Sequence, residues 1–426
     1  MDLYDYLFLL AWFTPMPDGW GIPILWTGPA GATKTGRHSA WARKMRSIFE
    51  HCSPGQKGEA YFGCTPSLMQ DRDGNYFFGF PPNQNILSMC SAGRGLILLD
   101  ELRAAPTIVG PSLLGILQER EWGDLSLPTG VRVMAASNSA KESVNGRSLS
   151  APAANRVCHI NWQDPEPSQM RDHALRMAAG PAFAPKTKID TSNYEHWQDV
   201  EDRILAARQQ GMSKALVEVF SYCERVKNAQ GESILRNQPA LGSTASDGPW
   251  ASPRTWWGVG ETVFAYRELV KQNVIPAPML PGGGVNTREA DSTILRTMVE
   301  GWVGPGVGGA YLEWLSEQDI PDYAEWLDGR IIVNFSHGIR DDRTFTIMQG
   351  AAAHVVNIDD PDVKLRRARK FFEIALNVAN NGGFELVSSA VALVADADPS
   401  AVYKEKTAFT STYAKRISDA KKQMRL

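Results

Sequence analysis

Short, continuous apolar runs stand out in the first third of the chain. The clearest are Ile22 to Trp26 and Leu96 to Leu99. Val131 to Ala136, interrupted by Arg132, and Val157 to Trp162 are also strand-like. An unbroken apolar run of this length is typical of a strand buried on both faces of a parallel sheet. The pattern therefore predicts an α/β core with a parallel sheet.

Apolar residues at helical spacing flank these runs. Leu7 to Phe13 predicts a short N-terminal helix. Ser39 to Phe49 predicts another helix, with Trp41, Met45 and Ile48 facing inward. The rest of the chain is mainly helical in pattern. The i, i+3, i+4, i+7 spacing recurs in two later sets, which are Leu216, Val219, Phe220 and Cys223, and then Trp256, Val259, Val263 and Phe264.

Glycine and proline divide this helical part. Ile275 to Gly284 carries three prolines before three glycines and is the best candidate for a linker. Gly301 to Gly309 is interpreted as a loop, since no Lys-Ser or Lys-Thr pair follows that would make it a phosphate site. The predicted domains are an α/β core over residues 1–165, a helical lid over 166–275 and a helical C-terminal extension over 285–426.

Aromatic residues crowd the stretch from Tyr61 to Pro82, above all in Tyr76-Phe77-Phe78-Gly79-Phe80. This stretch is either a hairpin packed on the core or a projecting loop that contacts a partner, since exposed aromatic side chains bind partners well. Core packing is the safer of the two interpretations.

Composition and charge exclude several classes of protein. The chain has 426 residues and a formal net charge of −3, which gives no support to binding driven by opposite charge on nucleic acid or membrane. No stretch is long and apolar enough to span a bilayer. The five cysteines form no CxxC pair, so we expect reduced thiols in a cytoplasmic protein. A zinc site at His51, Cys52 and Cys64 lacks a fourth ligand at sensible spacing.

The segment after the first apolar run has the composition of a phosphate-binding loop. A strand, a glycine-rich turn and a Lys-Thr pair at a helix start direct backbone N–H groups toward one point. Lys34 would contact the terminal phosphates of a nucleotide, and the Thr35 hydroxyl would be a Mg²⁺ ligand. The predicted binding residues are Gly28, Pro29, Ala30, Gly31, Ala32, Thr33, Lys34, Thr35 and Gly36.

Polar residues end two of the later strands. Asp100 and Glu101 follow the run Leu96 to Leu99, and carboxyl ends of parallel strands form the ligand-binding edge of an open sheet. Asp100 would hold Mg²⁺, and Glu101 would polarise the attacking water as general base. Asn138 either orients that water, contacts the γ-phosphate, or simply begins a turn.

The order of these motifs resembles an AAA-plus ATPase. The phosphate loop, LILLDEL, AASN and ANRV follow in that order, and LLDEL with LLGILQERE resembles the MoxR branch. Ser252-Pro253-Arg254 is similar to a tripeptide of the MoxR lid. The resemblance implies a homo-oligomer, a hexameric ring with nucleotide sites between subunits. It also implies Asn138 as first sensor, Arg254 as second sensor and Arg156 as the arginine finger reaching the neighbour's site.

Two positions depart from the family pattern. Thr33 replaces the glycine before Lys34, which bears on nucleotide affinity and turnover. The family's Asp-Glu-Ile-Asn-Arg-Ala becomes Asp-Glu-Leu-Arg-Ala-Ala, so that Arg103 is shifted by one place and the asparagine is missing. The contacts of that pair are expected to be rearranged.

The favoured function is ATP hydrolysis with ATP and Mg²⁺, coupled to remodelling or activation of a client or adaptor protein. The resemblance implies partners of the von Willebrand factor A type. One alternative is a nucleotide-dependent scaffold in which Thr33 has slowed hydrolysis. A less favoured alternative is a nucleic-acid motor, which depends only on the basic run Arg366 to Lys370.

Overall fold

A computed structural model of the protein describes most of the chain. The described residues are 1–63, 65–138, 149–164, 194–227, 231–239, 247–278, 288–317, 321–335 and 341–397. They fall into two compact units. The first comprises Met1–Leu205, Arg236–Val285 and Ser292–Gly309, and the second comprises Ala206–Leu235, Asn286–Asp291 and Ala310–Leu426.

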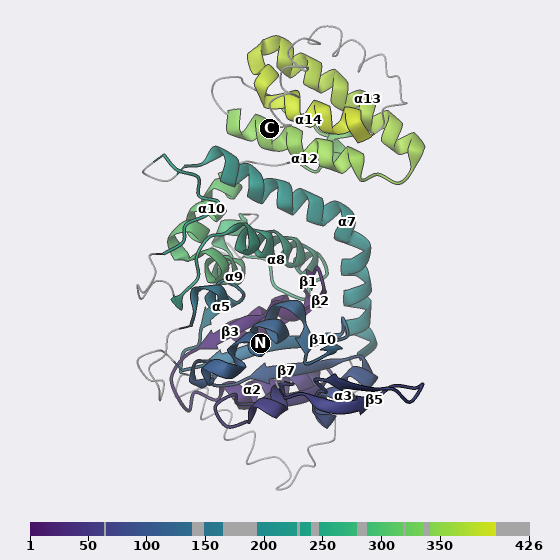
Figure 1. Ribbon diagram of the computed structural model, residues 1–426. Helices are drawn as coiled ribbons and strands as arrows, with labels where there is room; N and C mark the ends of the chain where they lie inside the picture. The colour runs from purple at the N-terminus through teal and green to yellow at the C-terminus, as the bar shows by residue number, and fades with distance from the viewer. Residues whose placement is uncertain are drawn as a thin grey trace. The chain divides into compact units, whose positions relative to one another are not determined.

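A five-stranded parallel sheet lies at the centre of the first unit (Figure 1). Its strand order is β11 (Cys158–Asn161), β3 (Ile24–Thr27), β10 (Val131–Ser137), β7 (Gly95–Leu99) and β4 (Ile48–Cys52). Every pair in the sheet is parallel, so all five carboxyl ends lie at one edge. The α/β core with a parallel sheet, predicted from the apolar runs, is confirmed.

The edge strand β4 corrects a prediction. The helix expected over Ser39 to Phe49 is α2, which covers only Lys34–Lys44. The chain then reverses at Arg46, whose φ of +49° is left-handed, and enters β4 at Ile48. Met45 caps the end of α2, and Ile48 begins a strand at the half-solvated edge of the sheet. Their three-residue spacing resembles that of a helix and gave a false helical signal. Ile48 is exposed, not inward-facing.

Short helices surround the sheet and bury its apolar faces. The predicted N-terminal helix is α1, which begins with a capping box at Asp2 and is buried from Leu7 to Phe13. Leu113, Ile116 and Trp122 pack into the core beside β7 and β10. The bounds of these elements are α1 (Leu3–Phe13), α3 (Gln84–Ala92), α4 (Gly110–Leu114), the π-helical turn η4 (Gly115–Glu119) and α5 (Ala151–Ala154).

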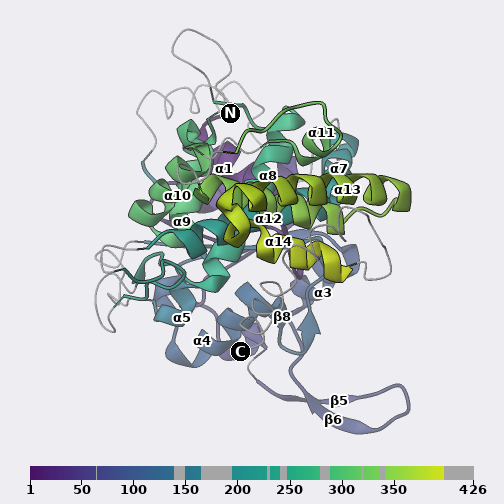
Figure 2. The same cartoon turned by 90° about the horizontal axis from the view of Figure 1, so that it is seen from above.

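The unit also contains three antiparallel ribbons. They are β1–β2 (Pro15–Met16 with Gly19–Trp20), β5–β6 (Ser67–Gln70 with Tyr76–Gly79) and β8–β9 (Glu121–Trp122 with Leu125–Ser126). The sequence favoured core packing for Tyr61 to Pro82. This prediction is confirmed for the buried Phe62 and is wrong for the β5–β6 hairpin. The hairpin's aromatic side chains are exposed, because no neighbouring element covers a ribbon that leaves the sheet (Figure 2).

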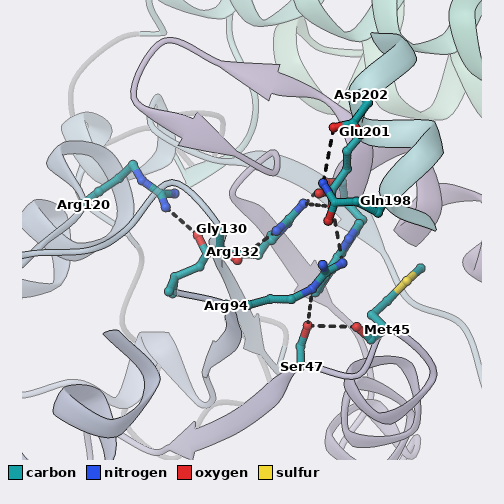
Figure 3. A network of polar contacts seen from close by, with 11 residues as sticks. Met45, Ser47, Arg94, Arg120, Gly130, Arg132, Gln198, Glu201 and Asp202 are labelled. Atoms are coloured by element: carbon teal, nitrogen blue, oxygen red, sulfur yellow. Dashed lines mark hydrogen bonds and ion pairs between the residues drawn. The ribbon is translucent and has the colours of Figure 1, made fainter. Parts of the chain in front are cut away.

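Buried ions fix β10 to the long helix α7 (Tyr194–Arg225), as Figure 3 shows. Arg132 is 1% exposed, and its guanidinium lies 2.7 Å from Glu201 and over the Trp12 ring. Arg94 lies 3.4 Å from the same carboxylate. Burial lowers the pKa of Arg132 to about 9 although Glu201 opposes this shift. Removing one partner would leave a buried charge, which is costly, so this group holds α7 to the sheet.

The first unit also contains α8 (Pro253–Lys271) and α9 (Thr293–Val303), and α10 (Pro305–Glu317) begins in this unit and continues in the second. All four residues of the set beginning at Trp256 are buried in α8, as their spacing predicted. The prediction of a loop over Gly301 to Gly309 is wrong. Gly304, with a φ of +92°, separates two helices. The second helix, α10, begins directly after it at Pro305, because proline favours the first position of a helix.

The second unit is helical. Its elements are α11 (Tyr323–Leu327), α12 (Asp341–Val356), α13 (Pro361–Val378), the π-helical turn η7 (Ala379–Gly383) and α14 (Phe384–Ala397). Ile347, Phe371 and Val387 contribute to its apolar core. This unit confirms the predicted helical C-terminal region.

The predicted domain boundaries stay predictions. The first, at residue 165, and the linker up to Gly284 lie largely outside the described residues. No described helix combines the length and apolar composition needed to cross a bilayer.

Candidate nucleotide site

The candidate phosphate loop joins β3 to α2 at the carboxyl edge of the sheet. Gly28 leaves the strand so close to Trp162 that a Cβ atom would lie 2.2 Å from its carbonyl oxygen. The Trp162 indole donates a hydrogen bond to the Ala32 carbonyl at 2.8 Å. Gly31 has a φ of +79° and opens the turn. The loop is thereby held against β11, and α2 begins at Lys34 with its first-turn N–H groups facing the loop.

Thr33 stands where the usual phosphate-loop pattern has glycine, and its backbone explains that preference. Its φ of +62° and ψ of +15° are left-handed, a conformation that costs a β-branched residue roughly 1–2 kcal/mol. Glycine adopts it without this cost. The substitution therefore keeps the shape of the turn and adds strain and a side chain next to Lys34.

Lys34 is buried, and its ammonium group lies over the loop. The Nζ atom donates to the Gly28 carbonyl at 2.9 Å and to the Pro29 carbonyl at 2.7 Å. It also donates to Asn138 Oδ1 at 3.3 Å. Asn138 follows β10, the strand next to β3. Residues 104 positions apart thus meet at the point where the loop would receive phosphate.

Asp100 directly follows β7 and contacts two side chains. Thr35 donates its hydroxyl hydrogen to Asp100 Oδ2 at 2.5 Å, and His51 Nε2 lies 3.0 Å from the same oxygen. Burial alone would raise the pKa of Asp100, but the His51 and Thr35 hydrogen bonds lower it below its ordinary value. The Asp100 contact in turn raises the pKa of His51. Sequence reasoning considered His51 only for a zinc site. It missed the contact with Asp100 because it missed β4, which ends at the same edge.

Glu101 is the second acid of the strand end. Its φ of +55° is left-handed, which is unusual for a residue with a side chain. Ser53, just after β4, donates its hydroxyl hydrogen to Glu101 Oε2 at 2.8 Å. The backbone turn and this hydrogen bond together fix the direction of the carboxylate. Nothing in the sequence near Ser53 signalled this contact.

The side chains at this edge fit Mg²⁺ better than zinc. A hydroxyl oxygen of Thr35 and a carboxylate oxygen of Asp100 already meet, and Mg²⁺ binds oxygen donors while keeping several waters. In the described part of the chain, no three His, Cys, Asp or Glu side chains are grouped as a metal site. Cys64, part of the weak zinc hypothesis, lies outside the described residues.

Arg103, the shifted arginine, is buried and forms an ion pair with Asp247. Asp247 also accepts a hydrogen bond from the Leu149 backbone at 2.6 Å. Asp247 lies six residues before α8, whose second residue is Arg254. The turn after Glu101 is therefore tied to the segment that leads into the helix carrying Arg254.

Arg156 and Arg254 lie together, away from the loop. Arg156 precedes β11, whose first residue Cys158 is in register with Ile24 at the start of β3. Four strand residues, about 13 Å, separate that amino edge from Gly28. Burial and the nearby Arg156 both lower the pKa of Arg254. The Ser252 hydroxyl donates to Asn155 Oδ1 at 2.9 Å, which holds the two arginine-bearing segments together.

A cavity of about 360 Å³ lies beside these two arginines. Its walls are mainly apolar and include Pro23, Val133, Arg156, Arg254, Trp257 and Trp302. The predicted site residues thus form two groups. Lys34, Thr35, Asp100, Glu101 and Asn138 meet at the carboxyl edge, whereas Arg156 and Arg254 face a separate cavity.

The basic run Arg366 to Lys370 lies on α13 and is largely paired with acids. Arg367 contacts Asp328 at 2.8 Å, and Arg366 contacts the same residue at 3.3 Å. Lys370 lies 3.0 Å from Glu373. Charges neutralised in this way offer little to a phosphate backbone.

A comparison with models of protein families finds no match, and a comparison with curated proteins finds none either. Among solved structures, the chain is similar to the crystal structure of "a putative ATPase" from Cytophaga hutchinsonii ATCC 33406, at 16% sequence identity and a TM-score of 0.42. The similarity covers 73% of this chain and 88% of that chain. This similarity is too low to indicate a function. The function is therefore inferred from the contacts of the candidate site alone.

Proposed function

We propose that the protein is an ATP hydrolase of the AAA-plus type, similar to the MoxR branch, which uses ATP and Mg²⁺. The observation that carries the proposal is the meeting of three strand ends at one loop. Lys34 contacts Asn138 from β10, and Thr35 contacts Asp100 from β7. A glycine-rich turn alone occurs in many proteins. The combination of the buried Lys34, the Thr35 hydroxyl and the Asp100 carboxylate fits a nucleoside triphosphate with its metal ion.

Each residue has a distinct part in the proposed reaction. Lys34 would neutralise charge on the terminal phosphates, and Thr35 and Asp100 would hold Mg²⁺, which would supply positive charge against the charge that develops on the phosphates. Glu101 accepts a proton from the attacking water, and Asn138 orients that water or the γ-phosphate. Ser53 sets the position of the Glu101 carboxylate before the nucleotide binds.

The two arginines support a site shared between subunits. Arg156 and Arg254 lie at the amino edge, about a strand length from the loop of their own subunit. A head-to-tail ring places one surface of each subunit against a different surface of the next, and would let this edge reach the neighbour's loop. We therefore propose that both act on the neighbour's nucleotide. A hexamer, and a client or adaptor protein such as a von Willebrand factor A protein, are further proposals that follow from the family resemblance.

The alternatives make different predictions. In a nucleotide-dependent scaffold, the strained Thr33 would permit ATP binding and assembly with little turnover. A nucleic-acid motor would require accessible cations, and the ion pairs of Arg366, Arg367 and Lys370 count against it.

Lys34→Ala tests the site. Loss of charge-assisted hydrogen bonds to phosphate should weaken ATP binding by at least about 10-fold. Lys44→Ala, an exposed lysine at the far end of the same helix, is the matched control and should bind normally. Binding is measured by fluorescence anisotropy of labelled ATP, and phosphate release is measured on the unaltered protein. Unchanged affinity in Lys34→Ala would remove the basis of the proposal, and binding without phosphate release would favour the scaffold.

A further inference from the structure

The cavity of about 360 Å³ beside Arg156 and Arg254 lies entirely within the first unit. Residues of the β1–β2 ribbon, the segment before β3, the turn η4, β10, α8 and α9 form its wall. Pockets that bind small molecules span roughly 300–1,000 Å³ and are mainly apolar with a few polar groups. The cavity therefore has the size and the composition of a site for a small molecule.

Two tryptophans give the cavity a fixed apolar wall. Trp302, from α9, is 3% exposed and donates its indole hydrogen to Thr262 Oγ1 at 3.1 Å. Gly258, on α8, permits this close packing, since a Cβ atom there would lie 2.8 Å from the Trp302 ring. Trp257 is 44% exposed, and its indole donates to Glu261 Oε1 at 3.0 Å. The wall is thus formed in advance, and an apolar ligand would bury more of it.

The two arginines supply positive charge at this cavity. Arg156 donates from Nη1 to the Pro152 carbonyl at 2.9 Å, and its buried Nε has no partner. Arg254 is exposed, and among the described residues neither arginine forms an ion pair. Burial and the charge of Arg156 lower the pKa of Arg254, and Glu119 opposes them. Two neighbouring guanidinium groups of this kind suit an anion, because one carboxylate can accept two N–H groups from a guanidinium.

The charge of the wall limits the kind of anion. Besides these two arginines, Arg120, Asp18 and Glu261 line the cavity, so three cations face two acids and the formal charge is +1. A carboxylate carries one negative charge, whereas a phosphate ester carries about 1.5–2 at neutral pH. One carboxylate therefore neutralises the cavity. A phosphate ester would leave excess negative charge in a mainly apolar site, which is costly.

We propose that this cavity binds a small apolar carboxylate, with its apolar body against Trp257 and Trp302 and its carboxylate on Arg156 and Arg254. In the proposed function, these two arginines act on the neighbour's nucleotide. A bound carboxylate would compete for the same guanidinium groups, and it would lower ATP turnover without touching the loop of its own subunit. The binding step stands by itself, and only the effect on turnover rests on the proposed function.

Binding is tested by isothermal titration calorimetry on the full chain without nucleotide. The probe is sodium octanoate. Octan-1-ol keeps the apolar chain, acetate keeps the carboxylate, and octyl phosphate carries a second negative charge. Octanoate should bind at least about 10-fold more tightly than each of the three, because it alone matches both the apolar wall and the single charge.

Two substitutions at exposed positions test the two parts of the wall. Arg254→Ala should weaken octanoate binding at least about 10-fold, since hydrogen bonds to a charged group are lost. Trp257→Ala should weaken it about 5-fold or more through loss of apolar contact. Arg203→Ala is the matched control, because this arginine has a side chain 58% exposed on α7 and lies outside the cavity wall. This variant should bind octanoate as the unaltered protein does.

Phosphate release tests the effect on turnover. Octanoate at ten times its Kd occupies about nine in ten cavities. Phosphate release by the unaltered protein should then fall at least about 5-fold, because the arginines that stabilise the reacting phosphate are occupied. Trp257→Ala should be less sensitive to the same concentration of octanoate.

The outcomes separate the site from the proposed function. Octanoate binding no tighter than that of octan-1-ol, or unchanged by both substitutions, would overturn the carboxylate site. Tighter binding of octyl phosphate would make the cavity a phosphate site instead. Octanoate binding with unchanged phosphate release would overturn the effect on turnover and leave the site standing. A protein that binds octanoate but hydrolyses no ATP would refute the proposed function alone.

Discussion

At the scale of single residues, backbone strain is found on both sides of the candidate site. Thr33 and Glu101 each have a left-handed backbone although neither is glycine. Strain of this kind costs on the order of 1–3 kcal/mol per residue and persists only where the surroundings hold it. Trp162 supports the loop, and Ser53 supports Glu101. The strained residues are those that would touch the phosphates and the attacking water.

Glu101→Gln tests the proposed base. The amide keeps the size of the carboxylate but accepts no proton, so turnover should fall by about 100-fold or more. ATP affinity should stay near that of the unaltered protein, because Lys34 and Thr35 are untouched. Glu59→Gln, an exposed glutamate, is the matched control. Turnover comes from phosphate release and affinity from labelled ATP, and near-normal turnover in Glu101→Gln would place the base elsewhere.

At the scale of elements, one ion pair connects the turn after Glu101 with the segment before α8. Arg103 follows the acidic strand end, and Asp247 precedes α8. Asn155 and Ser252 then join the start of β11 to the start of α8. A shift in the turn after Glu101 would thus reach the segments that carry Arg156 and Arg254. By this route, the state of one site would affect the neighbour's site.

Asp247→Asn tests that connection. The amide can still accept the hydrogen bond from Leu149 but loses the charge that pairs with Arg103. Turnover should fall about 10-fold or more, because small displacements of groups at a reacting centre are costly. ATP affinity should change little, since the loop is untouched. Asp71→Asn, on the exposed hairpin tip, serves as control. Equal losses of affinity and turnover would indicate general misfolding of the core instead.

At the scale of the whole molecule, the proposed site draws on two chains. The loop group and the arginine group lie at opposite edges of one sheet, and in our proposal a neighbouring subunit brings them together. Removing an arginine finger typically lowers turnover about 1000-fold or more. Both Arg156→Ala and Arg254→Ala should therefore suppress hydrolysis while leaving ATP affinity intact.

Mixing variants tests the shared site. Arg156→Ala mixed with Lys34→Ala should recover part of the turnover, because some junctions then join an intact loop to intact arginines. Arg254→Ala mixed with Lys34→Ala should behave in the same way. Arg156→Ala mixed with Arg254→Ala should recover nothing, since every junction lacks one arginine. If co-assembled mixtures with Lys34→Ala stay inactive at every ratio, the arginines act within their own chain or only support the fold.

The sequence by itself determined the features that are local. An apolar run followed by polar residues marks a buried strand and its end wherever it occurs, because both depend on consecutive positions. Hence β3, β7, β10 and β11 were predicted, and so were Lys34, Asp100, Glu101 and Asn138 as candidates. The edge strand β4 was missed because its pattern is mixed, with Ile48 and His51 exposed. The other edge strand, β11, keeps Cys158 and Ile160 buried and was predicted.

Only the tertiary structure decided which distant residues meet. Ser53 and Glu101 are 48 positions apart, and Arg103 and Asp247 are 144 apart. No local pattern records such contacts, since they arise from the stacking of strands and helices. The tertiary structure also decided that Tyr76 and Phe78 are exposed. An aromatic residue gives the same signal in a sequence whether it is buried or exposed. Burial depends on which other elements pack against a segment, and that is a property of the whole fold.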